Sequence, residues 1–169
     1  ITGAPGQGEF YLMRYPTQGG NFEAICLAPN TAQECMAMTV EAFYLAERFR
    51  MPVSVLADQL ITDGFEDISV PENDDEMKEL GFRVWPRKIH QGPDFYPSTD
   101  ALDVAPVAMG HNTGALCSDW TPTEEGFDIE EVEAHHKHAY RLIYKVRNHR
   151  DIFNHHFEKK YMDDDPDLV

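Results

Sequence analysis

The sequence predicts an α/β fold built around a parallel β-sheet. Three consecutive segments carry this prediction: an apolar run at residues 24–28, a helical pattern at residues 31–50, and a second apolar run at residues 53–57. Short connections join them, and a strand, a helix and a strand linked in this way form a crossover between parallel neighbours. We therefore expect the helix to cover one face of a sheet whose two faces are both buried.

Local signals define the ends of these elements. The first strand ends at Pro29-Asn30, and Thr31 and Glu34 then have the spacing of a capping box, which begins a helix. The helix ends at Met51-Pro52, because the residue before a proline is disfavoured in the α region. Apolar residues recur along it at steps of three and four, so that one stripe faces the sheet. The stripe consists of Cys35, Met38, Ala42, Leu45 and Phe49.

We expect residues 1–169 to form one partial domain with four consecutive parts. These are the strand–helix–strand core with a loop at its start (1–62), an irregular excursion (63–127), a long helix or helix pair (128–162) and a linker into a following domain (163–169). Prolines punctuate the excursion, which is typical of a lid, an arm or a subunit contact and holds one short helix at residues 74–80. The long helix is expected to begin at a capping box formed by Asp128 and Glu131.

The composition is that of a globular chain and argues against several classes of protein. Hydrophobic residues make up 42% of the 169, and no apolar run reaches the roughly 18 residues of a membrane-spanning helix. The 30 acidic and 14 basic residues give a formal charge of −16, and phosphate backbones repel such a surface, so no nucleic-acid partner is expected. The acidic residues cluster at residues 72–79, 124–133 and 163–167, and such clusters are typical of solvated faces.

The cysteines favour a reducing, cytoplasmic location. Cys26, Cys35 and Cys117 are an odd number and form no C-x-x-C pair, which argues against a disulfide framework and against an iron–sulfur cluster within these residues. Cys26 and Cys35 have apolar neighbours and are expected to be buried. The first residues lack both an initiator methionine and a signal-peptide pattern, and we expect the chain to be a piece of a longer protein.

Few residues indicate chemistry by spacing alone. His135 and His138 share a helix face, as a metal pair would, but no carboxylate or cysteine completes a known ligand spacing. Surface histidines are the preferred interpretation, and no metal site is expected. Asp58 follows the second strand, where α/β folds place their ligands. The N-terminal glycines resemble a phosphate-binding loop only loosely, because no strand is predicted before them.

Four motifs stand close together in the first part of the chain. They are Gly6-Gln7-Gly8-Glu9, Leu27-Ala28-Pro29-Asn30-Thr31-Ala32-Gln33-Glu34-Cys35, Thr39-Val40-Glu41-Ala42-Phe43, and the run from Leu45 to Gln59. In these motifs the chain resembles the α subunit of 2-oxoacid:ferredoxin oxidoreductases. The resemblance weakens through the excursion and returns at Gly110-His111 and in the histidine-containing helix. It implies a parallel-sheet thiamine-diphosphate-binding fold, and within it the C-terminal half of the domain that binds the aminopyrimidine end of the cofactor.

The resemblance also implies a reaction and a set of partners. The reaction is the oxidative decarboxylation of a 2-oxoacid to acyl-coenzyme A and CO2, with electrons passed to ferredoxin. Thiamine diphosphate, shared with a partner, supplies the chemistry, and Mg2+ and iron–sulfur clusters are expected on other domains or subunits. The implied partners are the β subunit of the same oxidoreductase, the other α-subunit domains and, through the complex, ferredoxin.

The same resemblance places a substrate-side loop at residues 2–8. The family commonly carries a basic residue there that meets the 2-oxoacid carboxylate, and Ala4 stands in its place, so Arg14 is the candidate substitute. No catalytic residue is assigned, because the cofactor-activating glutamate of the family lies before residue 1. The candidate substrate- and cofactor-proximal residues are Thr2, Gly3, Gly6, Gln7, Gly8, Arg14 and Asp58.

Two other functions stay open at this point. The missing basic residue at Ala4 is consistent with a non-catalytic subunit-interaction module on a thiamine-type fold. An unrelated acidic α/β domain with a metal-binding, histidine-rich helix is the remaining alternative.

Overall fold

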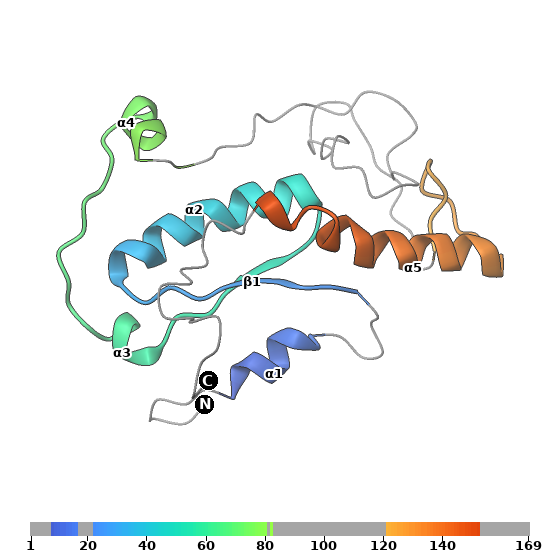
Figure 1. The fold of residues 1–169 in the computed structure, drawn as a ribbon, viewed down its shortest axis with the longest axis horizontal. Helices are drawn as coiled ribbons and strands as arrows, with labels where there is room; N and C mark the ends of the chain where they lie inside the picture. The colour runs from blue at the N-terminus through green and yellow to red at the C-terminus, as the bar shows by residue number, and fades with distance from the viewer. Residues whose placement is uncertain (1–7, 17–21, 81, 83–120, 153–169) are drawn as a thin grey trace, which may run out of the picture.

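A computed structural model describes residues 8–16, 22–80, 82 and 121–152 (Figure 1). These residues include the predicted strand–helix–strand core, the first part of the excursion and the first part of the predicted C-terminal helix. Residues 2–7 of the predicted loop, the Gly110-His111 turn, Cys117, residues 153–162 and the predicted linker at 163–169 lie outside the described residues.

A parallel strand–helix–strand unit forms the centre of the described fold. β1 (Ile25–Leu27) and β2 (Val53–Val55) pair in parallel, with Ile25 opposite Val53 and Leu27 opposite Val55. α2 (Ala32–Phe49) connects the two strands and runs back along one side of them (Figure 1). The predicted α/β fold with parallel strands is confirmed, although each strand has three residues and is shorter than the apolar run that predicts it.

Contacts at both ends of α2 account for its length. At its start the Thr31 hydroxyl accepts a hydrogen bond from the Glu34 N–H at 3.1 Å, and the Glu34 carboxylate accepts one from the Asn30 N–H at 2.7 Å. At its end Arg50 takes a left-handed conformation with φ of 50°, and Met51-Pro52 follows. The side-chain caps of Thr31 and Glu34 satisfy backbone N–H groups that the start of a helix leaves without partners. Both predicted ends of the helix are confirmed.

The described core lies between the sheet, α2 and the C-terminal end of α5 (Val132–Arg147). Leu45 and Phe49 are its most deeply buried large side chains, at 0% and 1% exposure, and both belong to the predicted stripe of α2. Val146 on α5 and Ile152 in the 3-10 turn η1 (Arg150–Ile152) join the same core. The core residues are Ile25, Leu27, Ala42, Tyr44, Leu45, Phe49, Val146 and Ile152.

α5 begins after the predicted capping box, so that part of the prediction is wrong. Its N-cap, Glu131, makes no side-chain capping bond. Asp128 pairs with Pro122 in an antiparallel bridge, beyond a turn closed by a 2.8 Å hydrogen bond from the Thr123 N–H to the Phe127 carbonyl. This pairing places Asp128 three residues before the N-cap, so the helix begins at Val132 and not at Asp128. α5 then ends at Arg147, and η1 follows within the described residues.

Short helices flank the core: α1 (Glu9–Arg14), α3 (Gln59–Thr62) and α4 (Asp74–Glu79). α4 confirms the short helix predicted in the excursion, and the Asn73 side chain caps it by accepting hydrogen bonds from the N–H groups of Asp75 and Glu76. α1 and α3 are not predicted from the sequence, because such short segments show no clear periodicity. Among the described helices, none is both long and apolar enough to cross a membrane.

Cys26 is exposed, so the prediction that it is buried is wrong. It stands between Ile25 and Leu27, which face the core, and successive side chains of a strand point to opposite faces of the sheet. Partial burial of the thiol still raises the pKa of Cys26, which disfavours the reactive thiolate at neutral pH. Cys35 is partly buried.

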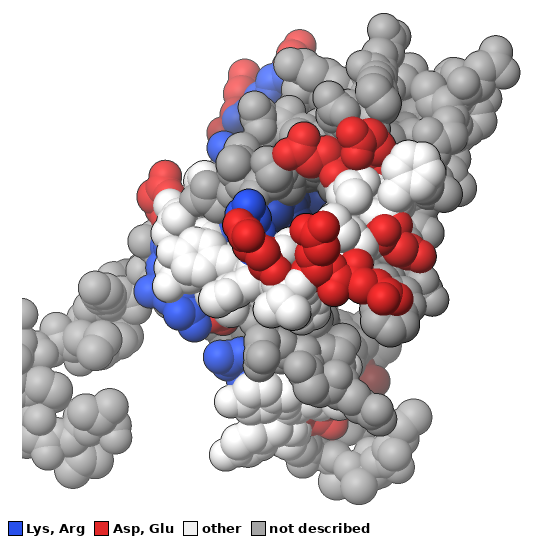
Figure 2. Space-filling view, turned by 90° about the vertical axis from the view of Figure 1, so that its right-hand side faces the viewer, with Lys and Arg blue, Asp and Glu red and all other residues white. Residues whose placement is uncertain are grey.

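Acidic side chains gather at the amino-terminal end of α5, on the face that Figure 2 shows. All the acidic residues of this segment are exposed, which confirms the prediction of a solvated face. They are Glu124, Glu125, Asp128, Glu130, Glu131 and Glu133.

Candidate functional site

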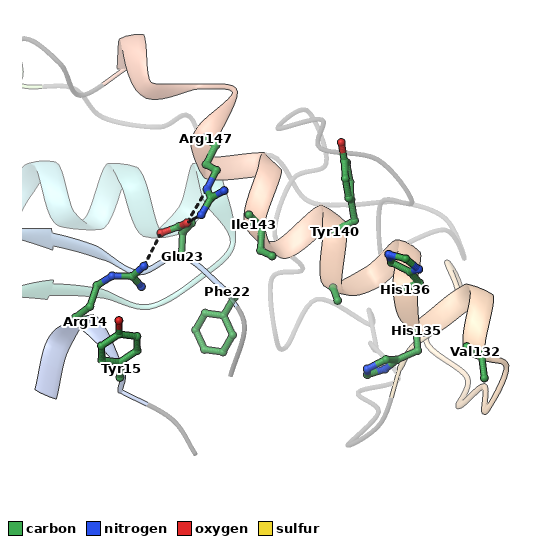
Figure 3. A pocket seen from close by; sticks show the side chains of 11 residues that line it. Arg14, Tyr15, Phe22, Glu23, Val132, His135, His136, Tyr140, Ile143 and Arg147 are labelled. Carbon is green, nitrogen blue, oxygen red and sulfur yellow. Dashed lines mark hydrogen bonds and ion pairs between the residues drawn. The ribbon is translucent and has the colours of Figure 1, made fainter. Parts of the chain in front are cut away.

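A pocket of about 640 Å³ lies at the amino-terminal end of β1, between α1 and α5 (Figure 3). Its volume is within the roughly 300–1,000 Å³ of small-molecule sites. Its walls come from the end of α1, the two residues before Ala24, and one face of α5. The lining residues are Arg14, Tyr15, Phe22, Glu23, Val132, His135, His136, Ala139, Tyr140, Ile143 and Arg147.

The apolar residues of α5 serve two different surfaces. Ala139 and Ile143 line the pocket, together with Val132, which is 85% exposed. Val146 instead belongs to the core, against α2. The apolar side chains of α5 are therefore divided between a wall of the pocket and the protein interior.

Glu23 is the ionic centre of the pocket. Its Oε1 accepts a hydrogen bond from Arg147 Nε at 2.7 Å and lies 2.5 Å from Arg147 Nη2. Its Oε2 lies 3.9 Å from Arg14 Nη2 (Figure 3). The Arg14 guanidinium also lies 4.9 Å from the centre of the Tyr15 ring, within the range of a cation–π contact. One carboxylate thus ties α1 and α5 to the start of β1.

We expect Glu23→Gln to lower the free energy of unfolding by about 1 kcal/mol. The effect stays small because the Arg14 and Arg147 side chains are 52% and 45% exposed, so water screens both ion pairs. Glu133→Gln is the control, since the side chains of its pair with Lys137 are 71% and 81% exposed and the pair should contribute less. Chemical denaturation checks the difference, and equal losses for the two variants would contradict a special role for Glu23.

The structure separates the two histidines that the sequence places on one helix face. His135 lines the pocket, and its Nδ1 is 2.8 Å from the Thr121 hydroxyl, a contact that fixes the orientation of the ring. His138 does not line the pocket, and burial together with nearby Arg141 and Lys145 lowers its pKa. A shared metal ligand pair is therefore not the arrangement seen here.

The described residues bring only one of the candidate site residues into the pocket. Arg14 lines it, whereas Thr2, Gly3, Gly6 and Gln7 lie outside the described residues. Gly8 is the N-cap of α1, where a Cβ atom would meet open space, so no steric requirement for glycine is seen there.

Asp58 lies at the other end of the sheet from the pocket. Its carboxylate accepts a 2.8 Å hydrogen bond from the Leu60 N–H and caps α3, directly after β2. The carboxyl ends of parallel strands lie at the same edge of a sheet, and Asp58 follows β2 at this edge. Arg14 pairs with Glu23, just before β1, and therefore lies near the opposite, amino-terminal edge. The structure does not bring these two candidates together.

Sequence reasoning missed Glu23, Phe22 and Arg147 as pocket residues. Glu23 and Arg147 meet across 124 positions of the chain, and no local pattern marks such a pair. Arg147 does carry a signal, a cation near a helix C-terminus, but that signal points to the helix dipole and not to a site.

The chain is similar to a known protein family over most of its length. Residues 3–139 match the family described as "Pyruvate flavodoxin/ferredoxin oxidoreductase, thiamine diP-bdg", that is, thiamine diphosphate-binding. The chain belongs to this family. The family covers the strand–helix–strand core, Arg14 and Glu23, and most of the pocket face of α5.

Curated relatives of this thiamine diphosphate-binding family member are subunits of 2-oxoacid oxidoreductases. The chain is 34% identical over 135 residues to the 2-oxoglutarate synthase subunit KorA of Methanothermobacter thermautotrophicus, covering 78% of this chain and 34% of the relative. It is 29% identical over 153 residues to the KorA subunit of Methanocaldococcus jannaschii, covering 89% and 40%. It is 43% identical over 53 residues to the ketoisovalerate oxidoreductase subunit VorB of Methanothermobacter marburgensis, covering 31% and 15%.

The chain therefore spans about a third of the length of the KorA subunit of Methanothermobacter thermautotrophicus. No solved structure matches it significantly.

The described residues fit the organic part of thiamine diphosphate better than its diphosphate. Tyr15 and Phe22 offer aromatic faces in a pocket of small-molecule size, next to the Glu23 carboxylate. A metal-bound diphosphate needs oxygen ligands that converge on one ion. Among the residues that the structure describes, no group of three or more His, Cys, Asp or Glu side chains is arranged to hold a metal ion.

Proposed function

We propose that this chain is a segment of the α subunit of a thiamine-diphosphate-dependent 2-oxoacid:ferredoxin oxidoreductase, and that it supplies the C-terminal half of the cofactor-binding domain. The reaction is the oxidative decarboxylation of a 2-oxoacid to acyl-coenzyme A and CO2, with electrons passed to ferredoxin. The family match over residues 3–139 is the observation that carries the proposal. The names of the relatives, 2-oxoglutarate synthase and ketoisovalerate oxidoreductase, support a 2-oxoacid substrate.

In this proposal the segment works inside a larger cytoplasmic assembly. Thiamine diphosphate supplies the electron sink for decarboxylation when it is bound. Mg2+ and the iron–sulfur clusters belong to other domains or subunits, and the partners are the β subunit, the other α-subunit domains and ferredoxin. The segment itself binds and orients the organic acid.

Arg14 is the side chain that we assign to the 2-oxoacid carboxylate. Its closest approach to Glu23, 3.9 Å, is longer than a hydrogen bond, and its side chain is half exposed. Its N–H donors can therefore turn to an incoming carboxylate. Arg14 and Arg147 together with Glu23 give a net charge of one positive unit, which suits a monocarboxylate. Phe22 and Ile143 provide apolar surface for the carbon chain of the acid.

We expect Arg14→Ala to raise KM for the 2-oxoacid by roughly 10- to 150-fold. A hydrogen bond to a charged group contributes about 1.5–3 kcal/mol, and the loss of this free energy corresponds to that change in KM. Arg150→Ala is the control, because Arg150 is exposed and does not line the pocket. The measurement is steady-state reduction of a viologen dye by the complete enzyme that contains this chain. An unchanged KM for Arg14→Ala would remove Arg14 from the substrate site.

One observation favours a second candidate, a non-catalytic subunit contact. α1 buries none of its residues, and Phe10, Tyr11 and Leu12 are 53%, 81% and 59% exposed. Large apolar side chains exposed together commonly mark protein contacts. If the segment only joined subunits, Phe10→Ser would weaken assembly, and Arg14→Ala would change neither KM nor kcat.

A further inference from the structure

The chain between α3 and α4, residues 64–72, combines a defined backbone path with exposed side chains. We call these residues the arm. The arm runs from the end of α3 past the start of α2 to the start of α4 (Figure 1). All of its residues except Pro71 are exposed. It belongs to the excursion for which the sequence predicts a lid, an arm or a subunit contact.

Hydrogen bonds hold the arm against the start of α2. The Glu66 carboxylate accepts a hydrogen bond from the Ala32 N–H at 2.7 Å. The Gln33 side-chain amide pairs with both backbone groups of Ser69: it accepts from the N–H at 2.7 Å and donates to the carbonyl at 3.1 Å. Gly64 is required at the start of the arm, since a Cβ atom there would lie 2.7 Å from a backbone carbonyl oxygen of α3. The path of the arm is therefore specified by the chain itself.

The apolar side chains of the arm stay in solvent. Phe65 is 102% exposed, Val70 is 62% exposed and Ile68 is 42% exposed. A single exposed apolar side chain is common on a protein surface. Three large ones within six residues are typical of a surface that contacts another protein. Hydrogen bonds, and not burial, thus hold the arm, which leaves its apolar side chains available to a partner.

The surroundings of the arm are strongly acidic. Residues 63–79 contain eight acidic residues and one basic residue, Lys78, whose Nζ lies 3.1 Å from an Asp75 carboxylate oxygen. Four other exposed carboxylates have no hydrogen-bond or ion-pair partner among the residues that the structure describes. A partner with positive charge would find these carboxylates unpaired. They are Asp67, Glu72, Asp74 and Glu79.

We propose that the arm docks on a different subunit, one that presents lysine and arginine side chains around an apolar depression. The depression takes Phe65 and the apolar side chains beside it, and the cations meet the unpaired carboxylates. A second copy of this chain does not suit the arm, because the chain has a formal charge of −16 and like charges across an interface repel each other.

The proposal rests on the multi-subunit enzyme proposed above and adds the surface and the chemistry of one subunit contact. Its tests measure contact and assembly, whereas the proposed function is tested by turnover. An active enzyme in which the arm contacts no other subunit would remove this proposal alone. An inactive complex in which the arm is covered by a basic subunit would remove the catalytic function alone.

The first test identifies what lies against the arm in the purified complete enzyme. The photoreactive residue p-benzoylphenylalanine replaces Phe65, irradiation joins it to the nearest chain, and mass spectrometry identifies the joined peptide. The control carries the same group in place of Phe127, which is 63% exposed and also lies among acidic residues. We expect position 65, and not position 127, to join a peptide of a different subunit that contains lysine or arginine. Joining only to this chain, to a second copy of it or to no protein would overturn the proposal.

The second test measures the Kd between the full-length subunit that contains this chain and the rest of the complex. We expect Phe65→Ser to raise Kd by about tenfold or more, as removal of a central apolar contact does. Phe127→Ser should leave Kd unchanged. Circular dichroism should show the same fold for both variants, because both side chains are exposed. Equal Kd values for the wild type and Phe65→Ser would overturn the proposal.

The third test examines the charge of the partner through the salt dependence of the same Kd. We expect Asp67→Asn combined with Glu72→Gln to reduce the rise of Kd between about 0.05 and 0.5 M salt, because fewer charge pairs are left for salt to screen. Glu124→Gln combined with Glu125→Gln is the control, since these exposed acidic residues lie outside the arm. An unchanged salt dependence in the first double variant, or an equal reduction in the control, would overturn the assignment of a basic partner to the arm.

Discussion

Replacing Phe49 by alanine is expected to lower the free energy of unfolding by about 3–5 kcal/mol. Phe49 is 1% exposed and stands where β2, α2 and the end of α5 meet. Its ring also makes an edge contact with His149, and its carbonyl accepts the Lys145 hydrogen bond. The substitution removes apolar contacts and leaves a cavity that the surrounding elements can fill only in part.

Phe43→Ala is the matched control for this substitution. Phe43 lies on the same helix but is 68% exposed, so its removal should change stability by less than about 1 kcal/mol. Denaturant unfolding of both variants, followed by circular dichroism, measures the difference. If Phe49→Ala were as stable as Phe43→Ala, the described packing of α5 on α2 would be incorrect.

Lys145→Met is expected to remove a pH dependence of stability between pH 7 and 10. In the folded protein the pKa of Lys145 is lowered from 10.5 to about 7. Between these two values the unfolded chain binds a proton that the folded chain does not, so the wild type becomes more stable as the pH rises, by up to about 1.4 kcal/mol per pH unit. Below pH 7 the full cost of the buried charge applies.

The measurable quantity is the stability of Lys145→Met minus that of the wild type, in chloride buffers. We expect this difference to fall by about 2 kcal/mol from pH 7 to pH 9, as the wild type loses its buried charge. Lys137→Met should show no such change, because Lys137 is in solvent. A difference that stays constant across this range would mean that Lys145 titrates like an ordinary surface lysine.

The parts of the fold that depend on neighbouring residues could be predicted from the sequence. Thr31 and Glu34 act within one helical turn, and Met51-Pro52 acts on the residue before it, so both ends of α2 are encoded locally. Asp128 has an equally good local signal, but its pairing with Pro122 across a turn outweighs it. Cys26 shows the same limit, since an apolar run does not tell which face of a strand lies inside.

The pocket depends on contacts between residues that are far apart in the sequence, and no local pattern predicts such contacts. Glu23 has no motif around it and gains its role only because the fold brings Arg14 and Arg147 to it from two helices. Asp58 has a clear position after a strand, and the same position makes it a helix cap. Arg14 could be proposed from the sequence only as a replacement for a missing basic residue, and its place in the pocket is consistent with that hypothesis.

The most direct test of the proposed function is 2-oxoacid-dependent dye reduction by the purified complex that contains this chain, assayed with coenzyme A. Pyruvate, 2-oxoglutarate and 2-oxoisovalerate are supplied in turn, with CO2 release measured alongside. We expect at least one of them to support both reactions, and removal of thiamine diphosphate to abolish them until it is restored. An intact complex that turns over none of the three with the cofactor present would contradict the catalytic account and favour the non-catalytic subunit contact.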